Sequence, residues 1–302
     1  RLGSPFWSKT KRKIKEEVEK LAQQLLDLYA KREITSRSPY QEPSLLSENV
    51  ASSFQYEETP DQVQALQEIE QDLAKEEPMD RLLCGDVGFG KTEIALRTMV
   101  RAVEQGYQAA LLAPTTILAY QHSQNFSERL KDLPIEVALL SRLQSQKEQQ
   151  EIISKIKEGK IDIIIGTHRI LSNDIQFSAK GGSALGGKNL GLLVIDDEQR
   201  FGVKQKEKLR ELKTSLDVLS LSATPIPRTL YMSLASLKSI SMIQTPPEGR
   251  FPVHIVVQKR SEKVVREALE KELTRKGQVY YLHNRIGTIA LVKKQLERLI
   301  PA

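Results

Sequence analysis

Short runs of wholly apolar residues alternate with longer amphipathic stretches between residues 81 and 221. A strand that is apolar at every position must be covered on both faces, which is typical of a parallel sheet with helices on either side. The sequence therefore predicts a doubly wound α/β domain over residues 49–245. The expected strands are Arg81–Cys84, Ala109–Ala113, Ile135–Leu140, Ile161–Ile165, Leu190–Ile195 and Val218–Leu221.

The first expected strand leads directly into Gly85-Asp-Val-Gly-Phe-Gly-Lys-Thr92, which fits the G-x-x-x-x-G-K-[ST] pattern of a phosphate-binding loop at every fixed position. A helix is expected to begin at Thr92, and its positive N-terminal end would add to the backbone N–H groups that face the phosphates. In such loops the lysine, here Lys91, reaches the β- and γ-phosphates, and the hydroxyl of Thr92 holds Mg²⁺. The segment predicts a site for ATP and Mg²⁺.

An acidic run, Asp196-Asp-Glu-Gln199, directly follows the expected strand that ends at Ile195. Because the ends of parallel strands meet at one edge of the sheet, Asp196 is expected near the phosphate loop. A nucleotide hydrolase needs one carboxylate there to hold Mg²⁺ and another group to position water. The predicted catalytic residues are Lys91, Asp196, Asp197 and Gln199, and the predicted Mg²⁺ ligands are Thr92 and Asp196.

The composition of the 302 residues, 39% hydrophobic and 28% charged, is typical of a globular protein with a substantial core. No apolar run reaches the roughly 18 residues of a membrane helix, and the basic start lacks a signal-peptide pattern, so we expect a cytoplasmic protein with no membrane partner. The net charge of +6 favours an anionic partner such as nucleic acid. Cys84, the only cysteine, lies in an apolar run and is expected to be a buried thiol.

Apolar residues recur at helical spacing over residues 9–33, which predicts one long amphipathic helix, and the aperiodic residues 34–50 favour a linker. A helix packed on a neighbouring domain and a free basic arm that binds nucleic acid both fit this pattern. Beyond the hinge candidate Thr245-Pro-Pro-Glu-Gly249, strands are expected at Val253–Val257 and Gln278–Leu282, and helices at Glu262–Arg275 and Ile289–Leu299. The expected domains are residues 1–48 for the helix and linker, 49–245 for the ATP-binding lobe, and 246–302 for the opening of a second α/β lobe.

Several segments carry a shared family pattern, namely Tyr56–Gln62, Gly85–Glu93, Ala113–Ala119, Leu140–Arg142, Ile165–His168, Asp196–Val203 and Ser222–Thr229. Together they resemble the core of superfamily 2 helicases, and within it the group of transcription-repair coupling factor (Mfd) translocases and RecG helicases. The last two segments are specific to this group, and Gly85–Glu93 with the start Arg1-Leu-Gly-Ser4 favours the coupling factors over RecG. The resemblance implies a RecA-like doubly wound P-loop NTPase lobe, preceded by a long helix and followed by an incomplete second RecA-like lobe.

The resemblance also implies roles for individual residues. Gln62, with Phe54 or Tyr56 nearby, resembles the motif that reads adenine. The residues implied to bind ATP are Phe54, Tyr56, Gln62, Asp86, Val87, Gly88, Phe89, Gly90, Lys91, Thr92 and Glu93. The residues implied to face the DNA backbone are Thr115, Thr116, Arg142, Thr167, His168, Arg200 and Arg228. Most are small polar or cationic groups, which suit a motor that grips phosphates without reading bases.

This sequence departs from the family pattern at Asp197, where relatives carry Glu. A positioning group displaced by about 1 Å can lower a rate by on the order of 10²-fold, so we expect slower hydrolysis unless Glu198 or a small shift compensates. A glycine-rich insertion at Ala179–Asn189 is expected to be a flexible surface segment. The chain also ends before the segments that supply the second lobe's arginine finger, so it is expected to bind nucleotide and to hydrolyse it weakly by itself.

The resemblance implies an ATP-dependent double-stranded DNA translocase motor that acts on stalled RNA polymerase in transcription-coupled nucleotide-excision repair. Its N-terminal helix is similar to the relay element that joins the polymerase-binding domain to the motor. RNA polymerase and excision-repair proteins would be partners through other domains. Two alternatives stay open at this point: a RecG-like fork-remodelling DNA helicase, and a hydrolysis-weak interaction module that ATP switches between conformations.

Overall fold

The computed structural model describes residues 12, 30, 32, 34–175, 177, 189–224, 239–250, 253 and 255–300. By its internal contacts the chain divides into two units, Arg1–Arg250 and Phe251–Ala302. The predicted N-terminal helix, the glycine-rich insertion and Arg228 lie outside the described residues, apart from Arg12, Ala30, Arg32 and Asn189. Within the described ranges, no helix is both long enough and apolar enough to cross a membrane.

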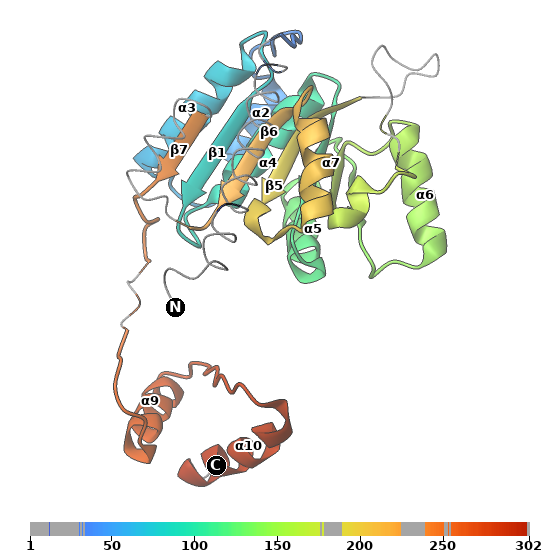
Figure 1. The fold of residues 1–302 in the computed structure, drawn as a ribbon. Coiled ribbons are helices and arrows are strands. Elements are labelled where there is room, and N and C mark those ends of the chain that lie inside the picture. The colour runs from blue at the N-terminus through green and yellow to red at the C-terminus, as the bar shows by residue number, and fades with distance from the viewer. Residues whose placement is uncertain are drawn as a thin grey trace. The chain divides into compact units, whose positions relative to one another are not determined.

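A seven-stranded sheet forms the centre of the first unit, as Figure 1 shows. Its strand order is β3-β4-β2-β5-β6-β1-β7, and every neighbouring pair is parallel. The strands are β1 (Asp80–Gly85), β2 (Gln108–Leu112), β3 (Val137–Leu140), β4 (Ile163–Gly166), β5 (Leu190–Asp196), β6 (Asp217–Ser222) and β7 (Ser239–Ile243). The predicted doubly wound α/β fold is confirmed. The edge strand β7 is missing from the sequence prediction because its polar and apolar residues are mixed and form no apolar run.

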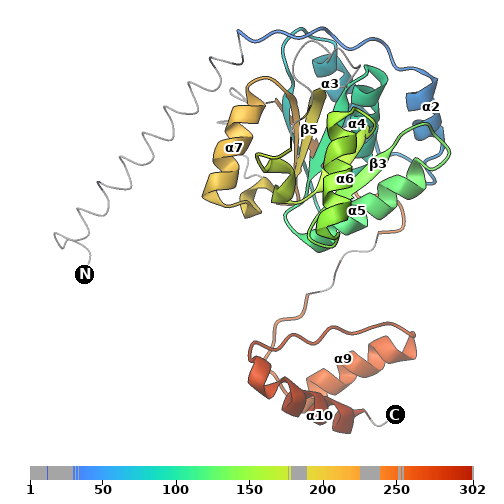
Figure 2. The same ribbon diagram turned by 90° about the vertical axis from the view of Figure 1, so that its right-hand side faces the viewer.

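Helices cover both faces of the sheet, and α2 (Leu45–Ser52) and α7 lie on opposite sides of it in Figure 2. One face packs against α3 (Pro60–Leu73), α4 (Lys91–Glu104) and α5 (Thr116–Arg129), and the other against α6 (Gln146–Lys157) and α7 (Val203–Lys213). Successive strand residues point to opposite faces, so the fully buried Leu111 and Leu112 belong to different cores. Burial on both faces explains why the strands are apolar at consecutive positions.

Helix α2 corrects the predicted linker over residues 34–50. The Ser44 side chain accepts a hydrogen bond from the Leu46 backbone N–H at 3.2 Å and so caps the helix. Val50 is fully buried in the core of the first unit. A helix of eight residues spans about two turns, and so short a segment shows no clear period in the sequence.

The chain just before α2 is attached to the edge of the sheet where the strands begin. The Arg32 guanidinium donates to the carbonyl oxygens of Pro78 and Met79, each at 2.9 Å. Arg37 forms an ion pair of 2.9 Å with Asp217, the first residue of β6. The end of the predicted relay helix and the segment that follows it therefore contact the edge opposite to the one where the phosphate loop leaves β1.

The second unit contains two described helices and a short 3₁₀ turn, α9 (Glu262–Thr274), α10 (Ile289–Leu299) and η3 (Ile286–Thr288). Both helices agree with the sequence prediction. The strands expected at Val253–Val257 and Gln278–Leu282 are wrong, because the described residues of these segments form no strand. Val257 is 92% exposed and Tyr280 is 97% exposed. A strand needs a paired neighbour for its backbone N–H and C=O groups, and a local apolar run does not reveal whether that neighbour exists.

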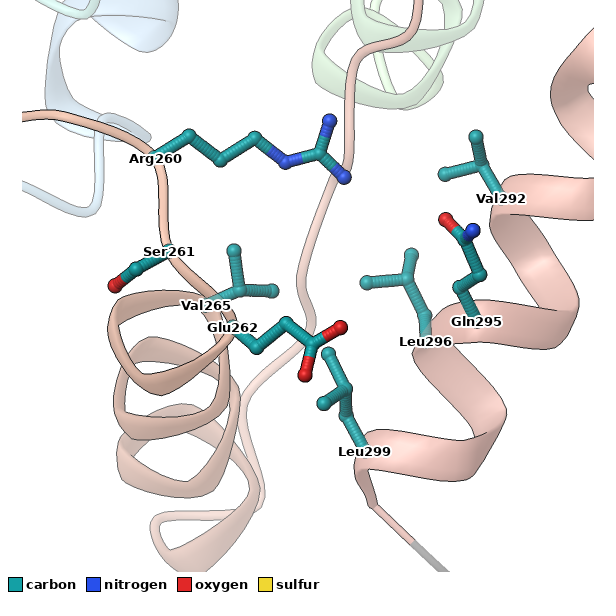
Figure 3. A pocket seen from close by; sticks show the side chains of 8 residues that line it. All are labelled: Arg260, Ser261, Glu262, Val265, Val292, Gln295, Leu296 and Leu299. Atoms are coloured by element: carbon teal, nitrogen blue, oxygen red, sulfur yellow. The ribbon is translucent and has the colours of Figure 1, made fainter.

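A pocket of about 300 Å³ lies between α9 and α10, as Figure 3 shows. It is lined by Arg260, Ser261, Glu262, Val265, Val292, Gln295, Leu296 and Leu299. Valine and leucine side chains of the two helices face each other across it, with polar side chains at the margin. The pocket contains none of the residues predicted to bind nucleotide or DNA.

Candidate nucleotide-binding and catalytic site

Three neighbouring strands deliver the predicted nucleotide motifs to one edge of the sheet. Asp196 at the end of β5 is level with Leu221 of β6, and Ser222 is level with Cys84 of β1. The phosphate loop begins one residue later, at Gly85. Because β5, β6 and β1 are adjacent and parallel, the acidic run, the Ser222-Ala-Thr224 segment and the loop leave the sheet side by side.

The phosphate loop is shaped by two glycines and fastened by a glutamine. Gly88 and Gly90 both have φ of +81°, a left-handed conformation that side chains other than glycine rarely adopt. A Cβ atom at Gly90 would also lie only 2.3 Å from Nε2 of Gln62. That amide donates to the Phe89 carbonyl at 2.9 Å, while its Oε1 accepts from the Thr59 backbone N–H at 3.0 Å. Gln62 therefore ties the loop to the N-terminus of α3.

Lys91, the first residue of α4, is turned back onto its own loop. Its Nζ donates to the carbonyl oxygens of Gly85 at 2.7 Å and Asp86 at 2.8 Å. Burial lowers the pKa of Lys91, and the nearby carboxylates of Asp196, Asp197 and Asp86 oppose that effect. The ammonium group thus lies within electrostatic reach of both predicted catalytic aspartates. Its two carbonyl partners are neutral, so an anionic phosphate would be a stronger partner for it.

Asp196 is held by a histidine that belongs to none of the predicted motifs. Nε2 of His122, on α5, lies 3.1 Å from Oδ2 of Asp196. Both side chains are largely buried, with 12% and 19% exposure. Positions 122 and 196 are far apart in the chain, and no spacing rule links a histidine on one helix with an aspartate on a distant strand. His122 therefore fixes the orientation of the predicted metal ligand.

Asp197 combines a strained backbone with an unused acceptor. Its φ of +47° places a non-glycine residue in the left-handed region, which costs about 1–2 kcal/mol and is common at functional sites. Its Oδ1 is buried and accepts no hydrogen bond from the described residues. Its Oδ2 lies 3.3 Å from Nε of the exposed Arg200. An acceptor of this kind is suited to orienting a water molecule.

The next acidic residue points elsewhere. The Glu198 carboxylate pairs with Nζ of Lys213 on α7 at 2.8 Å and accepts a longer hydrogen bond from the Ser220 hydroxyl at 3.4 Å. In this arrangement Glu198 does not substitute for the longer acid that the family resemblance implies at position 197. Gln199 is exposed in the 3₁₀ turn η2 (Glu198–Arg200).

Phe54 and Tyr56, the aromatic residues implied to accompany the adenine motif, form a cluster with two arginines. The Phe54 ring has the Arg97 guanidinium 5.4 Å from its centroid and the Arg129 guanidinium at 5.6 Å. Tyr56 packs edge-on against Phe54 with a centroid distance of 5.5 Å. Glu93, which is implied to bind nucleotide, instead accepts hydrogen bonds from Arg97 at 3.0 Å and Arg129 at 2.7 Å. Its visible role is to orient the two arginines beneath Phe54.

The residues implied to face DNA follow the other strands of the same edge. Thr115 is exposed and caps α5 by accepting from the Leu118 backbone N–H at 3.2 Å, and Thr116 is the first residue of that helix. Arg142 and His168 are exposed after β3 and β4. The side chain of Thr167 is the exception, because the residue is only 4% exposed. The phosphate loop and the acidic run thus follow β1 and β5, and the implied DNA contacts within the described residues follow β2, β4 and β3, except for Arg200 in the turn after β5.

Magnesium at this site would depend on the nucleotide itself. In the part of the chain that the structure describes, no group of three or more His, Cys, Asp or Glu side chains is arranged to hold a metal. Mg²⁺ commonly binds one or two protein groups and completes its octahedral shell with phosphate oxygens and water. Thr92, the second residue of α4, and Asp196 at the end of β5 fit that requirement.

The family model for DEAD/DEAH box helicases matches residues 59–233, from the cap of α3 to beyond β6. The chain belongs to the DEAD/DEAH box helicase family. The match contains the phosphate loop and the acidic run, so the family signal and the geometry of the sheet edge concern the same residues. The sheet is accordingly that of a RecA-like helicase lobe.

This helicase lobe is similar to larger DNA-repair proteins. It is 47% identical over 301 residues to the transcription-repair-coupling factor of Staphylococcus aureus strain USA300, and 46% identical to that of Staphylococcus haemolyticus strain JCSC1435. All of this chain and 25% of each relative are covered, so the chain spans about a quarter of their length. A structure of RecG bound to a three-way DNA junction has 31% identity and a TM-score of 0.72, covering 91% of this chain and 37% of RecG. The resemblance to coupling factors and RecG is confirmed.

We predict that His122→Ala raises the Mg²⁺ concentration that nucleotide binding requires. Outer-shell partners of metal ligands typically contribute about 10- to 100-fold to metal affinity, and His122 is the partner of Asp196. A Mg²⁺ titration of ATP-analogue binding should shift its midpoint at least tenfold upward in the variant, by the same reasoning. The exposed His168→Ala is the matched control and should leave the midpoint unchanged. Equal midpoints for both variants would contradict the assignment.

Proposed function

We propose that the chain is the ATP-binding motor lobe of an ATP-dependent double-stranded DNA translocase of the transcription-repair coupling kind. The observation that carries the proposal is the position of Lys91. Its ammonium group donates to two carbonyls of the phosphate loop and is close enough to Asp196 and Asp197 for their charges to act on it. The 47% identity to transcription-repair-coupling factors over the whole chain supports the choice of translocase.

In the proposed mechanism, Lys91 exchanges the carbonyls of Gly85 and Asp86 for the phosphates of ATP. The charge-assisted contact replaces two weaker ones, and the loop amides complete the phosphate cradle. Thr92 and Asp196 would hold Mg²⁺, which would neutralise negative charge on the phosphates. Asp197 orients the attacking water with Oδ1, which accepts no hydrogen bond from any residue that the structure describes. Its shorter side chain limits the rate relative to relatives that carry Glu.

The opposite half of the same sheet edge would hold the DNA backbone. Thr115, Thr116, Arg142 and His168 are the proposed contacts in that half, and Arg200 in the turn after β5 is a further proposed contact. Most of them offer hydroxyl or cationic groups to phosphate oxygens. In this proposal the whole protein acts in the cytoplasm on stalled RNA polymerase and recruits excision-repair proteins through regions beyond this chain. The name of its relatives, transcription-repair-coupling factor, supports a role that joins transcription and repair.

A RecG-like fork-remodelling helicase is the second candidate. The RecG structure bound to a three-way DNA junction covers 91% of this chain at 31% identity, which supports this candidate as well. The flanking domains decide between the two, because a polymerase-binding module and a fork-binding wedge contact different substrates. A nucleotide-gated module with little hydrolysis is the third candidate, and it rests on the short acid at Asp197.

We predict that Lys91→Ala lowers DNA-stimulated ATP hydrolysis by about 100-fold or more, since one preorganised charge contact to a transition state commonly contributes about 10²- to 10³-fold. The assay uses this lobe within a chain extended to the length of its relatives, with double-stranded DNA and Mg²⁺. Lys131→Ala, at an exposed lysine after α5, is the matched control. Full activity in Lys91→Ala would exclude the phosphate loop as the ATP site.

We predict that Asp197→Glu increases DNA-stimulated turnover in the same extended chain. The additional methylene moves the carboxylate by about 1 Å toward the position that the family's Glu occupies, and a shift of that size can change the rate by on the order of 10²-fold. Asp197→Asn, which removes the negative charge, should lower turnover. An unchanged or lower rate in Asp197→Glu would refute the limiting role of the short side chain, and tight ATP binding without turnover in both forms would favour the nucleotide-gated module.

A further inference from the structure

Arg250 contacts the phosphate loop from a position that no nucleotide motif includes. Its Nη2 lies 3.1 Å from the carboxylate of Asp86, and its Nη1 donates a hydrogen bond to the Val87 carbonyl. Its guanidinium carbon lies 4.6 Å from the centroid of the buried Phe89 ring. One side chain therefore touches three loop residues through an ion pair, a hydrogen bond and a cation–π contact.

The hydrogen bond to Val87 affects the amide that follows it. In a trans peptide unit the C=O and N–H groups point in opposite directions, so fixing the Val87 carbonyl also fixes the direction of the Gly88 N–H. Gly88 is among the loop residues implied to bind ATP, and its backbone N–H is its only donor. Lys91 holds the carbonyls of Gly85 and Asp86 in the same loop. Two cations thus hold the first five residues of the loop, Lys91 at Gly85 and Asp86, and Arg250 from Asp86 to Phe89.

Arg250 is also the last residue of the first unit, and the segment that leads to it is anchored beside the nucleotide site. Oδ2 of Asp61 accepts hydrogen bonds from the backbone N–H groups of Gln244 at 2.8 Å and Thr245 at 2.7 Å. Asp61 precedes Gln62, which binds the Phe89 carbonyl. The backbone N–H of Thr245, then that of Gln244, keeps the pKa of Asp61 low, although burial opposes them. Both ends of the segment 244–250 are therefore attached beside the nucleotide site, the first end to Asp61 of α3 and the last, Arg250, to the phosphate loop.

We infer that Arg250 is a positioning residue for the phosphate loop, which orients the Gly88 N–H for a phosphate oxygen and couples phosphate binding to the docking of residues 244–250. The inference rests on the proposed function, because it assumes that the loop binds a nucleotide. Coupling of this kind is reciprocal, so a bound nucleotide stabilises the docked segment as much as the docked segment favours the nucleotide. A signal from the phosphate loop would then reach the point where the second unit begins.

The test compares equilibrium binding of Mg·ADP to the 302-residue chain and to four variants. Arg250→Gln should bind about tenfold more weakly, which is the scale expected for a lost hydrogen bond to a charged group. Arg250→Lys should be weakened less, because an ammonium keeps the charge but not the planar stacking on Phe89. Arg260→Gln, at an exposed arginine outside the first unit, should be unchanged. Lys91→Ala should lose most of its affinity and tests the proposed site itself.

Hydrogen exchange supplies a readout that a purely structural role would not change. Mg·ADP should slow amide exchange in residues 244–250 of the unaltered chain, and this protection should disappear in Arg250→Gln even where the variant is saturated with nucleotide. If Arg250→Gln binds Mg·ADP within twofold of the unaltered chain and keeps the protection, the inference is overturned, while the proposed ATP site is unaffected. If Lys91→Ala binds as well as the unaltered chain, the proposed function fails instead. If circular dichroism shows that Arg250→Gln is unfolded, Arg250→Lys is used for the test instead. Unchanged affinity and unchanged protection in Arg250→Lys would then overturn the inference.

Discussion

The ammonium group of Lys91 is the feature on which the functional centre depends. It is held by two carbonyls of its own loop, it is partly buried, and three aspartate carboxylates act on its charge. A cation in that position is stable only because β1, β5 and β6 are adjacent in the sheet and end at nearly the same level. The strand order is therefore a requirement of the site, since it brings an acidic run to a lysine roughly a hundred residues earlier in the chain.

The sheet edge divides into two neighbouring halves, and helix α5 belongs to both. Its cap, Thr115, follows β2 on the side of the proposed DNA contacts. Two turns later on the same helix, His122 binds Asp196, the predicted metal ligand of the nucleotide half. Helix α5 therefore connects the two halves directly, through its N-terminus and its middle turn. A change in the orientation of Asp196 would act directly on the element that presents Thr115 and Thr116.

Much of the fold is predictable from the sequence because a parallel sheet covered on both faces needs consecutive apolar residues. The six apolar runs from β1 to β6 and the loop after β1 follow from that rule and from the glycines at 88 and 90. Helix α2 and strand β7 are short, and β7 carries a mixed polar pattern, so neither produces a periodic signal. The strands expected after residue 252 depend on partners that a local pattern cannot specify. In the site, His122 and Arg250 escape prediction for the same reason, since each acts through a contact between residues distant in the chain.

A crystal structure of the chain with Mg²⁺ and a non-hydrolysable ATP analogue tests the central claim most directly. The site requires the Lys91 ammonium to leave the Gly85 and Asp86 carbonyls and to contact the terminal phosphates, with Mg²⁺ between Thr92 and Asp196 and a water molecule on Oδ1 of Asp197. A nucleotide bound elsewhere, with Lys91 still on the two carbonyls, would contradict the assignment of this edge as the motor's ATP site.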